Sequence, residues 1–377
     1  MNRYARQTIL PEMGQEGQER LKSASVLCIG AGGLGSPALL YLAAAGIGRI
    51  GLVDDDAVDI SNLQRQVLFK EADQGKPKVE AAKAALAELN SECKIEAYHE
   101  LFSAENAEAL LKNYDVIIDG TDNFSTKFLI NDACVKFGKP LVYGSILGFV
   151  AQVSVFWAKG ENYHGPCYRC LYPKPPSGHI PNCAEAGVIG AMAGIAGTVQ
   201  ALEAIKMALG LKWCKEKNLE PLLGTLWILD ARSMQTKTLK LHKRHQCAVC
   251  SANPSDIVLE QAEESCAAKT DVKNISAEDA AKLMGKAVFI DVREAHELAS
   301  GRIPKALHIP LGTLLSNEDS VGDIASDTPV IVYCQHGIRS FSAASHLVAL
   351  GFRNVAHITG GIVRWKGELA SHQQKPF

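Results

Sequence analysis

Short apolar runs alternate with longer amphipathic stretches through the first part of the chain. The strand-like runs are residues 25–29, 49–53, 116–119 and 140–143, and the helix-like stretches between them are 36–45 and 79–89. Within residues 79–89, apolar residues recur three or four positions apart with charged residues between them, as on a helix with one buried face. The alternation predicts an α/β fold with a largely parallel sheet.

The character of the sequence changes after residue 250. Residues 251–272 are polar and carry Asn253-Pro254 near their start, as a connecting segment would. Beyond them, strand-like runs at 287–290 and 330–333 and a helix-like stretch at 340–349 predict a second, smaller α/β unit. A chain of 377 residues also suits two domains. We therefore expect domains at 1–250 and 273–377, joined by a linker at 251–272.

The overall composition is that of a globular protein, with 47% hydrophobic residues, 21% charged residues and a net charge of −2. This balance argues against non-specific nucleic-acid binding, which needs an excess of basic residues. Arg3 and Arg6 stand where a secretory signal would soon require an apolar run. The longest apolar run, 188–199, is too short to span a membrane, so we expect a buried helix there and a cytoplasmic protein.

A glycine-rich loop follows the first predicted strand. Its sequence matches G-x-G-x-x-G, with glycines at Gly30, Gly32, Gly33 and Gly35. Such glycines let the backbone approach a phosphate closely, at a helix N-terminus that offers free N–H groups. Asp54 ends the second strand, where a carboxylate can bind ribose hydroxyls. On these residues alone, an NAD-dependent dehydrogenase is as good an interpretation as an ATP-binding enzyme.

Three further segments favour the ATP-binding enzyme over the dehydrogenase. They are residues 54–66, 75–78 and 119–123, and together they resemble the ubiquitin-activating superfamily, within it the molybdopterin-synthase and thiamine sulfur-carrier adenylyltransferases. The resemblance runs from Arg3 to about Cys250. It implies a Rossmann-like domain that uses ATP to adenylate the C-terminal glycine of a ubiquitin-like sulfur-carrier protein ending in Gly-Gly.

Adenylation brings the carrier carboxylate to the α-phosphate of ATP, so the site must offset the repulsion between two anions. The resemblance implies that Arg65 and Lys78 neutralise the triphosphate and that Asp122 is a ligand of Mg²⁺, which favours few carboxylates plus phosphate oxygens. It also implies that Arg6 reaches the partner's nucleotide in a homodimer. The expected nucleotide-binding residues are Arg6, Gly30, Gly32, Gly33, Gly35, Asp54, Asn62, Arg65, Gln66, Lys78, Asp122 and Asn123.

Four of the eleven cysteines form two C-x-x-C pairs. Two thiolates at this spacing can hold one metal ion, and two such pairs complete a tetrahedron. A single C-x-x-C could equally be a redox pair, but two of them favour structural Zn²⁺. The adenylyltransferases that the chain resembles hold zinc at matching positions, so the expected zinc ligands are Cys167, Cys170, Cys247 and Cys250.

Cys183 lies between these pairs and belongs to neither. A lone cysteine is most often a small core residue. Here it stands among turn residues before a glycine-rich helix, and a cysteine occupies this place in relatives that are fused to sulfur-transfer domains. We therefore expect Cys183 either to attack the adenylate or to resolve an acyl–disulfide intermediate.

A second reactive cysteine opens the loop after the strand at 330–333. Cys334 and Arg339 enclose four residues, and backbone N–H groups of such a loop can form an anion site that favours the thiolate. A cysteine phosphatase needs five residues between the two, so the smaller loop suits a persulfide better. With segments 289–294 and 301–310, the loop resembles the rhodanese sulfurtransferases over residues 272–377, although Arg302 and Lys305 replace the usual His and Gly.

The two halves together predict one enzyme with two activities. After ATP activates the carrier, a persulfide on Cys334, assisted by Arg339, would supply sulfur and leave a carrier thiocarboxylate. The persulfide would itself come from a cysteine desulfurase or from thiosulfate. The product could serve the synthesis of molybdenum cofactor, thiamine, cysteine or a sulfur-containing secondary metabolite, and the sequence does not choose among them. The alternatives are a dehydrogenase and a zinc scaffold that only binds a carrier.

Overall fold

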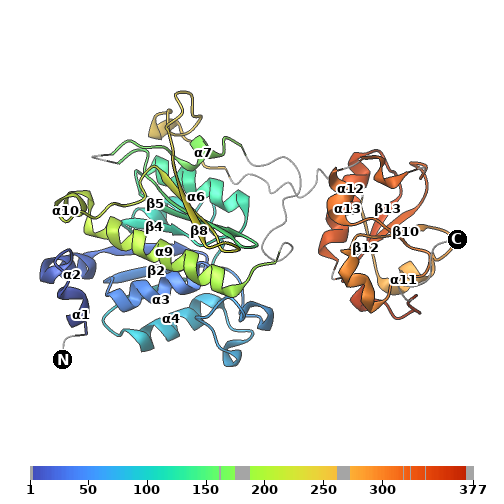
Figure 1. The fold of residues 1–377 in the computed structure, drawn as a ribbon, viewed down its shortest axis with the longest axis horizontal. Coiled ribbons are helices and arrows are strands. Elements are labelled where there is room, and N and C mark those ends of the chain that lie inside the picture. The colour runs from blue at the N-terminus through green and yellow to red at the C-terminus, as the bar shows by residue number, and fades with distance from the viewer. Residues whose placement is uncertain are drawn as a thin grey trace. The chain divides into compact units, whose positions relative to one another are not determined.

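The computed structural model describes residues 3–160, 163–174, 187–260, 272–316, 318–322, 324–335 and 337–370. The chain divides into two compact units, Met1–Glu264 and Ser265–Phe377, which run from blue to yellow and from orange to red in Figure 1. This division lies within the stretch 251–272, whose role as a linker stays a prediction. Among the described residues, no helix is both long and apolar enough to cross a membrane.

The first unit is built on an eight-stranded sheet in the order β3-β2-β1-β4-β5-β6-β7-β8. The strands from β3 to β5 are parallel, and β6, β7 and β8 extend the sheet in antiparallel fashion. Because β1 pairs with both β2 and β4, the direction of strand addition reverses at β1, and ligands of open α/β sheets bind at such a point. The strands are β1 (Ser25–Ile29), β2 (Arg49–Val53), β3 (Lys94–Tyr98), β4 (Val116–Asp119), β5 (Leu141–Leu147), β6 (Val150–Phe156), β7 (Thr225–Asp230) and β8 (Gln235–Lys240).

Helices cover both faces of the parallel strands (Figure 1). Val26 and Cys28 of β1 pack with the helices α3, α4 and α9, while Leu27 and Ile29 pack with α5 and α6 on the other side. A strand buried on both faces must be apolar at every position, which explains the unbroken run at 25–29. The helices are α1 (Ala5–Thr8), α2 (Gly14–Ser23), α3 (Gly35–Ala45), α4 (Lys78–Leu89), α5 (Ala107–Leu111), α6 (Phe124–Lys136), α7 (Tyr168–Leu171), α9 (Gly190–Leu209) and α10 (Leu211–Glu216), with 3-10 turns η1 (Ile60–Asn62), η2 (Glu71–Asp73) and η3 (Pro254–Asp256).

Helix α9 corrects one prediction from the sequence. The apolar run 188–199 indicates a buried helix, and the structure places there a helix that is longer and only partly buried. Ala196 and Ala204 are buried, but Ile195 and Leu202 are 36% and 54% exposed. The helix is apolar on both sides, and within the described chain only one side packs against the sheet and α3.

The second unit contains a five-stranded parallel sheet in the order β11-β10-β12-β13-β9. Separate hydrophobic clusters cover its two faces, one around Val332 and Leu347 and one around Phe289 and Ile331. Its strands are β9 (Lys273–Ile275), β10 (Val288–Asp291), β11 (Leu307–His308), β12 (Val330–Tyr333) and β13 (Val355–Ile358). Its helices are α11 (Ala277–Ala281), α12 (Leu311–Ser316) and α13 (Ile338–Ala349), with 3-10 turns η4 (Ala295–Ser300), η5 (Glu318–Val321) and η6 (Ile362–Arg364).

The predicted strands of this unit are present within one residue of their expected limits. Helix α13 begins at Ile338 rather than at residue 340, because Gly337 takes a φ of +101° and turns the chain directly into the helix. The tight loop predicted between Cys334 and this helix is therefore shorter than the sequence indicates. Cys334 stands directly after β12, at the carboxyl end of the central strand.

Candidate active sites and a four-cysteine cluster

The glycine-rich loop joins β1 to α3 at the switch point of the sheet. A Cβ on Gly35 would lie 2.0 Å from the carbonyl oxygen of Gly30, and one on Gly30 would lie 2.9 Å from the backbone of Gly120 after β4. Both glycines are therefore required by close backbone contact. A Cβ on Gly32 would meet nothing closer than 3.8 Å, so packing alone does not demand glycine there. Gly32 leaves space that a ligand could use.

Asp54 fastens this loop to the end of β2. Its Oδ2 accepts a hydrogen bond of 2.8 Å from the N–H of Ala31, and its Oδ1 accepts one of 3.0 Å from the N–H of Asp56. Burial raises the pKa of Asp54, and the charge of nearby Lys78 opposes that rise. The carboxylate predicted to bind ribose thus also holds the loop in position.

Two cations, Lys78 and Arg65, lie beside the loop. The Nζ of Lys78 is 2.6 Å from the Oδ2 of Asp56, and the lysine side chain is only 6% exposed. Arg65 lies 3.5 Å from the position of a Cβ on Gly33, and its guanidinium donates to the carbonyl of Ser61. A buried ammonium whose carboxylate partner is exposed can exchange that partner for a phosphate, because the exposed carboxylate loses little on release.

Gln66 provides the clearest sign of a ligand. The residue is 3% exposed, its Nε2 lies beside Gly32, and its Oε1 is buried with no hydrogen-bond partner among the residues that the structure describes. An unsatisfied buried amide oxygen costs free energy on the order of 1–3 kcal/mol unless something pairs with it. Asn62 lies one turn earlier, where its Oδ1 accepts from the N–H of Asp59. The described residues therefore bring an open glycine, an unpaired amide and two cations to one end of the sheet.

The loop after β4 carries Asp122 and Asn123. Asp122 is exposed, whereas the Oδ1 of Asn123 accepts from the N–H of Thr126 and caps α6. Sequence reasoning missed the group beneath this loop, in which Lys127 pairs with Asp119 at 2.9 Å and donates to the carbonyl of Gly144. Lys127 is 5% exposed and Asp119 is 1% exposed. In the sequence, the only indication of this buried pair is that Lys127 stands among apolar residues of a helix.

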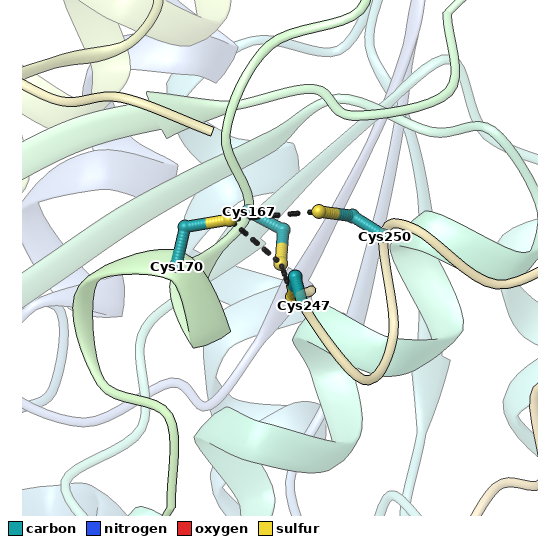
Figure 2. A group of neighbouring side chains, drawn as sticks. All are labelled: Cys167, Cys170, Cys247 and Cys250. Atoms are coloured by element: carbon teal, nitrogen blue, oxygen red, sulfur yellow. Dashed lines mark hydrogen bonds between the residues drawn. The ribbon is translucent and has the colours of Figure 1, made fainter. Parts of the chain in front are cut away.

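Figure 2 shows four cysteine side chains from two distant segments pointing at one another. The Sγ atoms of Cys167 and Cys170 are 4.0 Å apart, Cys167 and Cys247 are 3.6 Å apart, and Cys170 and Cys250 are 3.5 Å apart. A tetrahedral Zn²⁺ with Zn–S bonds of about 2.3 Å holds its sulfurs about 3.8 Å apart. The cluster therefore has the dimensions of a four-thiolate metal site, and it could hold a metal ion.

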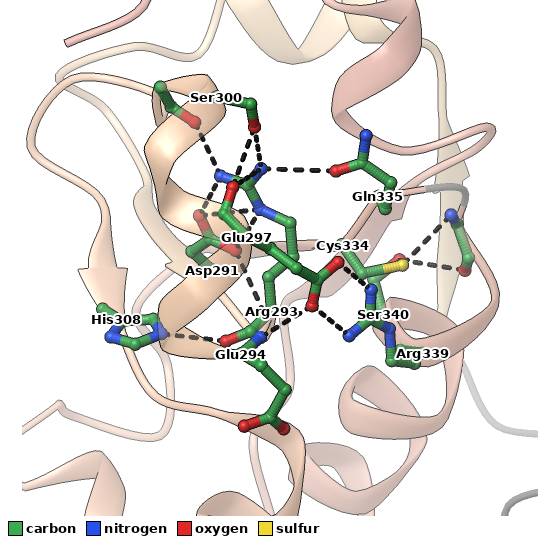
Figure 3. A network of polar contacts seen from close by, with 12 residues as sticks. Asp291, Arg293, Glu294, Glu297, Ser300, His308, Cys334, Gln335, Arg339 and Ser340 are labelled. Carbon is green, nitrogen blue, oxygen red and sulfur yellow. Dashed lines mark hydrogen bonds and ion pairs between the residues drawn. The ribbon is translucent and has the colours of Figure 1, made fainter. Parts of the chain in front are cut away.

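Cys334 is 1% exposed and begins the loop between β12 and α13 (Figure 3). Its Sγ accepts a hydrogen bond of 3.1 Å from the N–H of Gly337 and lies 3.7 Å from the Oγ of Ser340. That hydroxyl lies 3.3 Å from His357 Nδ1, and burial lowers the pKa of this histidine. An N–H directed at the sulfur stabilises a thiolate or the sulfur of a persulfide.

A charged network stands beside Cys334. Arg339 makes a bidentate pair with Glu297, with both N–O distances 2.6 Å. Arg293 is fully buried, pairs with Asp291 at 2.8 Å and reaches the Oε1 of Gln335 at 3.3 Å. Asp291 and Arg293 therefore form a buried ion pair. The network in Figure 3 thus joins the cysteine loop to η4.

Three residues singled out in the sequence, Lys305, Arg6 and Cys183, take no part in the contacts described so far. Lys305, where rhodaneses usually carry glycine, has a φ of +63° and occupies a conformation that favours glycine. Arg6 is exposed on α1. Cys183 lies outside the described residues.

Comparison with known protein families gives a match for each of the two units. Residues 4–249 match the ThiF family, and residues 276–368 match the rhodanese-like domain. The chain therefore belongs to the ThiF family and carries a rhodanese-like domain in its second unit.

Two curated relatives align with nearly the whole chain, and a third aligns with 71% of it. "Adenylyltransferase and sulfurtransferase MOCS3" of Aedes aegypti is 40% identical over 386 residues, covering 96% of this chain and 86% of the relative. "Probable adenylyltransferase/sulfurtransferase MoeZ" of Mycobacterium tuberculosis is 39% identical over 385 residues, covering 97% and 93%. "Sulfur carrier protein adenylyltransferase" of Thermus thermophilus is 47% identical over 270 residues, covering 71% and 96%.

A solved structure supports the fold of the first unit. The crystal structure of Escherichia coli MccB with ATP superposes with a TM-score of 0.56 at 23% identity, covering 67% of this chain and 75% of that one. At this level of identity the likeness concerns the fold alone.

Proposed function

We propose that this enzyme adenylates the C-terminal glycine of a ubiquitin-like sulfur carrier and then replaces the adenylate by sulfur from Cys334. The observation that carries the proposal is that one chain joins a ThiF-family nucleotide site to a rhodanese-like cysteine loop. Relatives with the same two domains over nearly their whole length are named for both transfers. Each half supplies what the other lacks: an activated carboxylate and a sulfur nucleophile.

The first step requires cations near a phosphate, and Arg65 and Lys78 supply them. Lys78 would exchange its contact with Asp56 for the nucleotide, and the free Oε1 of Gln66 would accept a donor from the ligand or its water. Asn62 would add a neutral hydrogen bond. Asp122 would hold Mg²⁺, which supplies charge neutralisation at the phosphates. The backbone of Gly30, Gly32, Gly33 and Gly35, with Asp54 and Asn123, would shape the nucleotide pocket.

The second step transfers sulfur. The outer sulfur of the Cys334 persulfide attacks the carboxyl carbon of the acyl-adenylate, the bond from that carbon to the phosphate oxygen breaks, and AMP leaves with the electron pair. A thiol then breaks the S–S bond of the acyl disulfide and releases the carrier thiocarboxylate. The N–H of Gly337 holds the Cys334 sulfur, and Arg339 stands beside it.

Carrier-dependent exchange of pyrophosphate into ATP tests the first half of this proposal. We expect exchange only when a carrier ending in Gly-Gly is present. A dehydrogenase or a zinc scaffold that merely binds the carrier would give none. The carrier that yields a thiocarboxylate would also decide between molybdenum-cofactor and thiamine synthesis.

A homodimer would complete the nucleotide site if Arg6 reaches the partner's phosphates. Near Arg6, Ile9 and Leu10 are 77% and 51% exposed, as residues at a contact between copies would be in a single chain. A cytoplasmic location would suit the cysteines, because those described are all free thiols.

The four-cysteine cluster would hold Zn²⁺ with a structural role. Four sulfurs leave no open coordination position for a substrate. The cluster joins α7 to the segment before η3, and Arg169 beside it pairs with Asp132 of α6 at 2.7 Å. Zinc would thus tie the end of the first unit to its core.

Cys170→Ser is expected to reduce bound zinc well below one per chain and to lower the melting temperature of the first unit by roughly 10 °C. Zinc is measured by atomic absorption, and melting by calorimetry. Cys93→Ala, a buried cysteine outside the cluster, is the matched control and should keep its zinc. A wild-type chain with no bound zinc would refute the assignment.

Cys183→Ser is expected to slow thiocarboxylate formation while leaving pyrophosphate exchange at the wild-type rate. A thiol at this position would attack the adenylate to give a thioester or break the acyl disulfide, and serine does neither efficiently. Mass spectrometry of the carrier after a single turnover measures the effect. Equal rates for the variant and the wild type would remove Cys183 from the mechanism.

A further inference from the structure

The guanidinium of Arg339, which interacts electrostatically with Cys334, is already paired. Both terminal nitrogens of Arg339 lie 2.6 Å from the two carboxylate oxygens of Glu297. The two side chains are 21% and 19% exposed, so water screens the pair only partly. The hydrogen bonds from Arg339 hold the pKa of Glu297 at about 2, and the carboxylate is therefore charged at any physiological pH.

The rest of the network adds no free positive charge. Arg293 is buried against Asp291, and the exposed Glu294 also acts on the charge of Arg339. Both arginines labelled in Figure 3 are therefore paired, and Glu294 adds a further carboxylate whose charge acts on Arg339. A small dianion approaching the sulfur would find neither of these two described arginines free to bind it.

Sulfur donors differ in the charge that they bring. Thiosulfate is a dianion, and its transfer requires the Cys334 thiolate to attack the outer sulfur while sulfite leaves with the electron pair. A cysteine persulfide, R–S–SH, is neutral or a monoanion. The thiolate attacks its outer sulfur, the donor's S–S bond breaks, R–S⁻ leaves and the proton stays with the transferred sulfur. Only the first reaction needs an unpaired cation.

We propose that Glu297 selects the class of sulfur donor: by neutralising Arg339 it makes Cys334 accept sulfur from a cysteine persulfide and discriminates against thiosulfate. This inference rests on the proposed role of Cys334 as the sulfur acceptor. Glu297 acts through Arg339 and does not touch the sulfur itself, so it is a positioning residue that determines specificity.

Replacing Glu297 by glutamine separates the effect of the negative charge from the effect of the side chain's shape. Glu297 also accepts a hydrogen bond of 2.8 Å from the N–H of Glu294, which caps η4. Glutamine can keep that bond and one bond to Arg339, so Glu297→Gln removes the negative charge with little change in shape. Glu297→Asp keeps the charge and provides the conservative comparison.

The test measures how fast Cys334 gains one sulfur, by mass spectrometry of the peptide that contains it, in the full chain. One donor is thiosulfate, and the other is the persulfide of N-acetylcysteine methyl ester, which carries no other charge. For Glu297→Gln we expect the half-saturating thiosulfate concentration to fall roughly tenfold, with the persulfide value changed by less than about twofold. Glu297→Asp should retain the wild-type preference.

Three further variants keep the inference open to refutation. When Glu297→Gln is combined with Arg339→Gln, the half-saturating thiosulfate concentration should return to about the wild-type value, because the double variant has no guanidinium at position 339 to bind the dianion. Glu294→Gln leaves the ion pair between Arg339 and Glu297 intact. It should lower the half-saturating thiosulfate concentration too, but by a smaller factor than Glu297→Gln. Glu278→Gln breaks an exposed pair with Lys366 elsewhere in the unit and should change neither donor.

The inference fails if Glu297→Gln leaves thiosulfate loading unchanged or if it slows both donors equally, which would indicate a purely structural pair. Should that variant not fold, an unchanged preference in Glu294→Gln would refute the inference. If Cys334 takes sulfur from neither donor in the wild type, the proposed function itself fails instead. Pyrophosphate exchange, which needs no sulfur, is the check that the chain is active.

Discussion

Lys78→Ala is expected to reduce carrier-dependent ATP–pyrophosphate exchange by at least about a thousandfold. The Lys78 ammonium is 6% exposed beside the glycine-rich loop, and its partner Asp56 is largely exposed. Removing it would leave the developing charge on the phosphates without a buried cation, where the screening by water is weakest. Arg65→Ala should have a comparable effect, because that side chain lies beside Gly33 of the same loop.

The control is Lys76→Ala. Lys76 stands two residues away, is 57% exposed and pairs with Asp73, so its loss should leave exchange unchanged. Thermal unfolding of all three variants shows whether a lost activity reflects lost structure. Exchange that survives in folded Lys78→Ala or Arg65→Ala would mean that the phosphates bind elsewhere.

Cys334→Ser is expected to abolish thiocarboxylate formation and to leave pyrophosphate exchange intact. Serine fits the same buried position after β12 and can accept the N–H of Gly337, but it cannot carry a sulfane sulfur. The two activities should therefore separate completely in this one variant. The measurement combines exchange with mass spectrometry of the carrier.

Cys93→Ala is the control for a cysteine that is buried in the first unit and has no proposed chemistry. It should support both activities. Thiocarboxylate formed by Cys334→Ser at the wild-type rate would show that another sulfur reaches the adenylate, and the role assigned to the second unit would be wrong.

Features coded by adjacent residues were predictable from the sequence. Gly30 and Gly35 are glycines because a side chain at either position would collide with nearby backbone, and a fixed local spacing records this need. Cys334 and its loop likewise occupy consecutive positions. The two cysteine pairs could be recognised because each pair has its own spacing, although only the structure shows that four sulfurs meet.

Pairs between distant segments could not be predicted. Nothing in the local sequence around Arg339 indicates that Glu297 neutralises it, because the contact depends on how η4 packs beside α13. Lys127 appears within an apolar helix and becomes intelligible only when β4 places Asp119 against it. The exposed side of α9 was missed for a related reason: an apolar sequence does not say which of its faces the rest of the chain covers.

The central claim is that one chain both activates a carrier and gives it sulfur. The direct test loads Cys334 with a persulfide, removes the free donor, and adds ATP, Mg²⁺ and a carrier ending in Gly-Gly. The account predicts a single turnover, only with ATP, in which the carrier first joins Cys334 as an acyl disulfide. Once a thiol has split that disulfide, the carrier has gained the mass of one oxygen replaced by sulfur and Cys334 has lost its sulfur. Formation of AMP and pyrophosphate with all of the sulfur retained on Cys334 would contradict it.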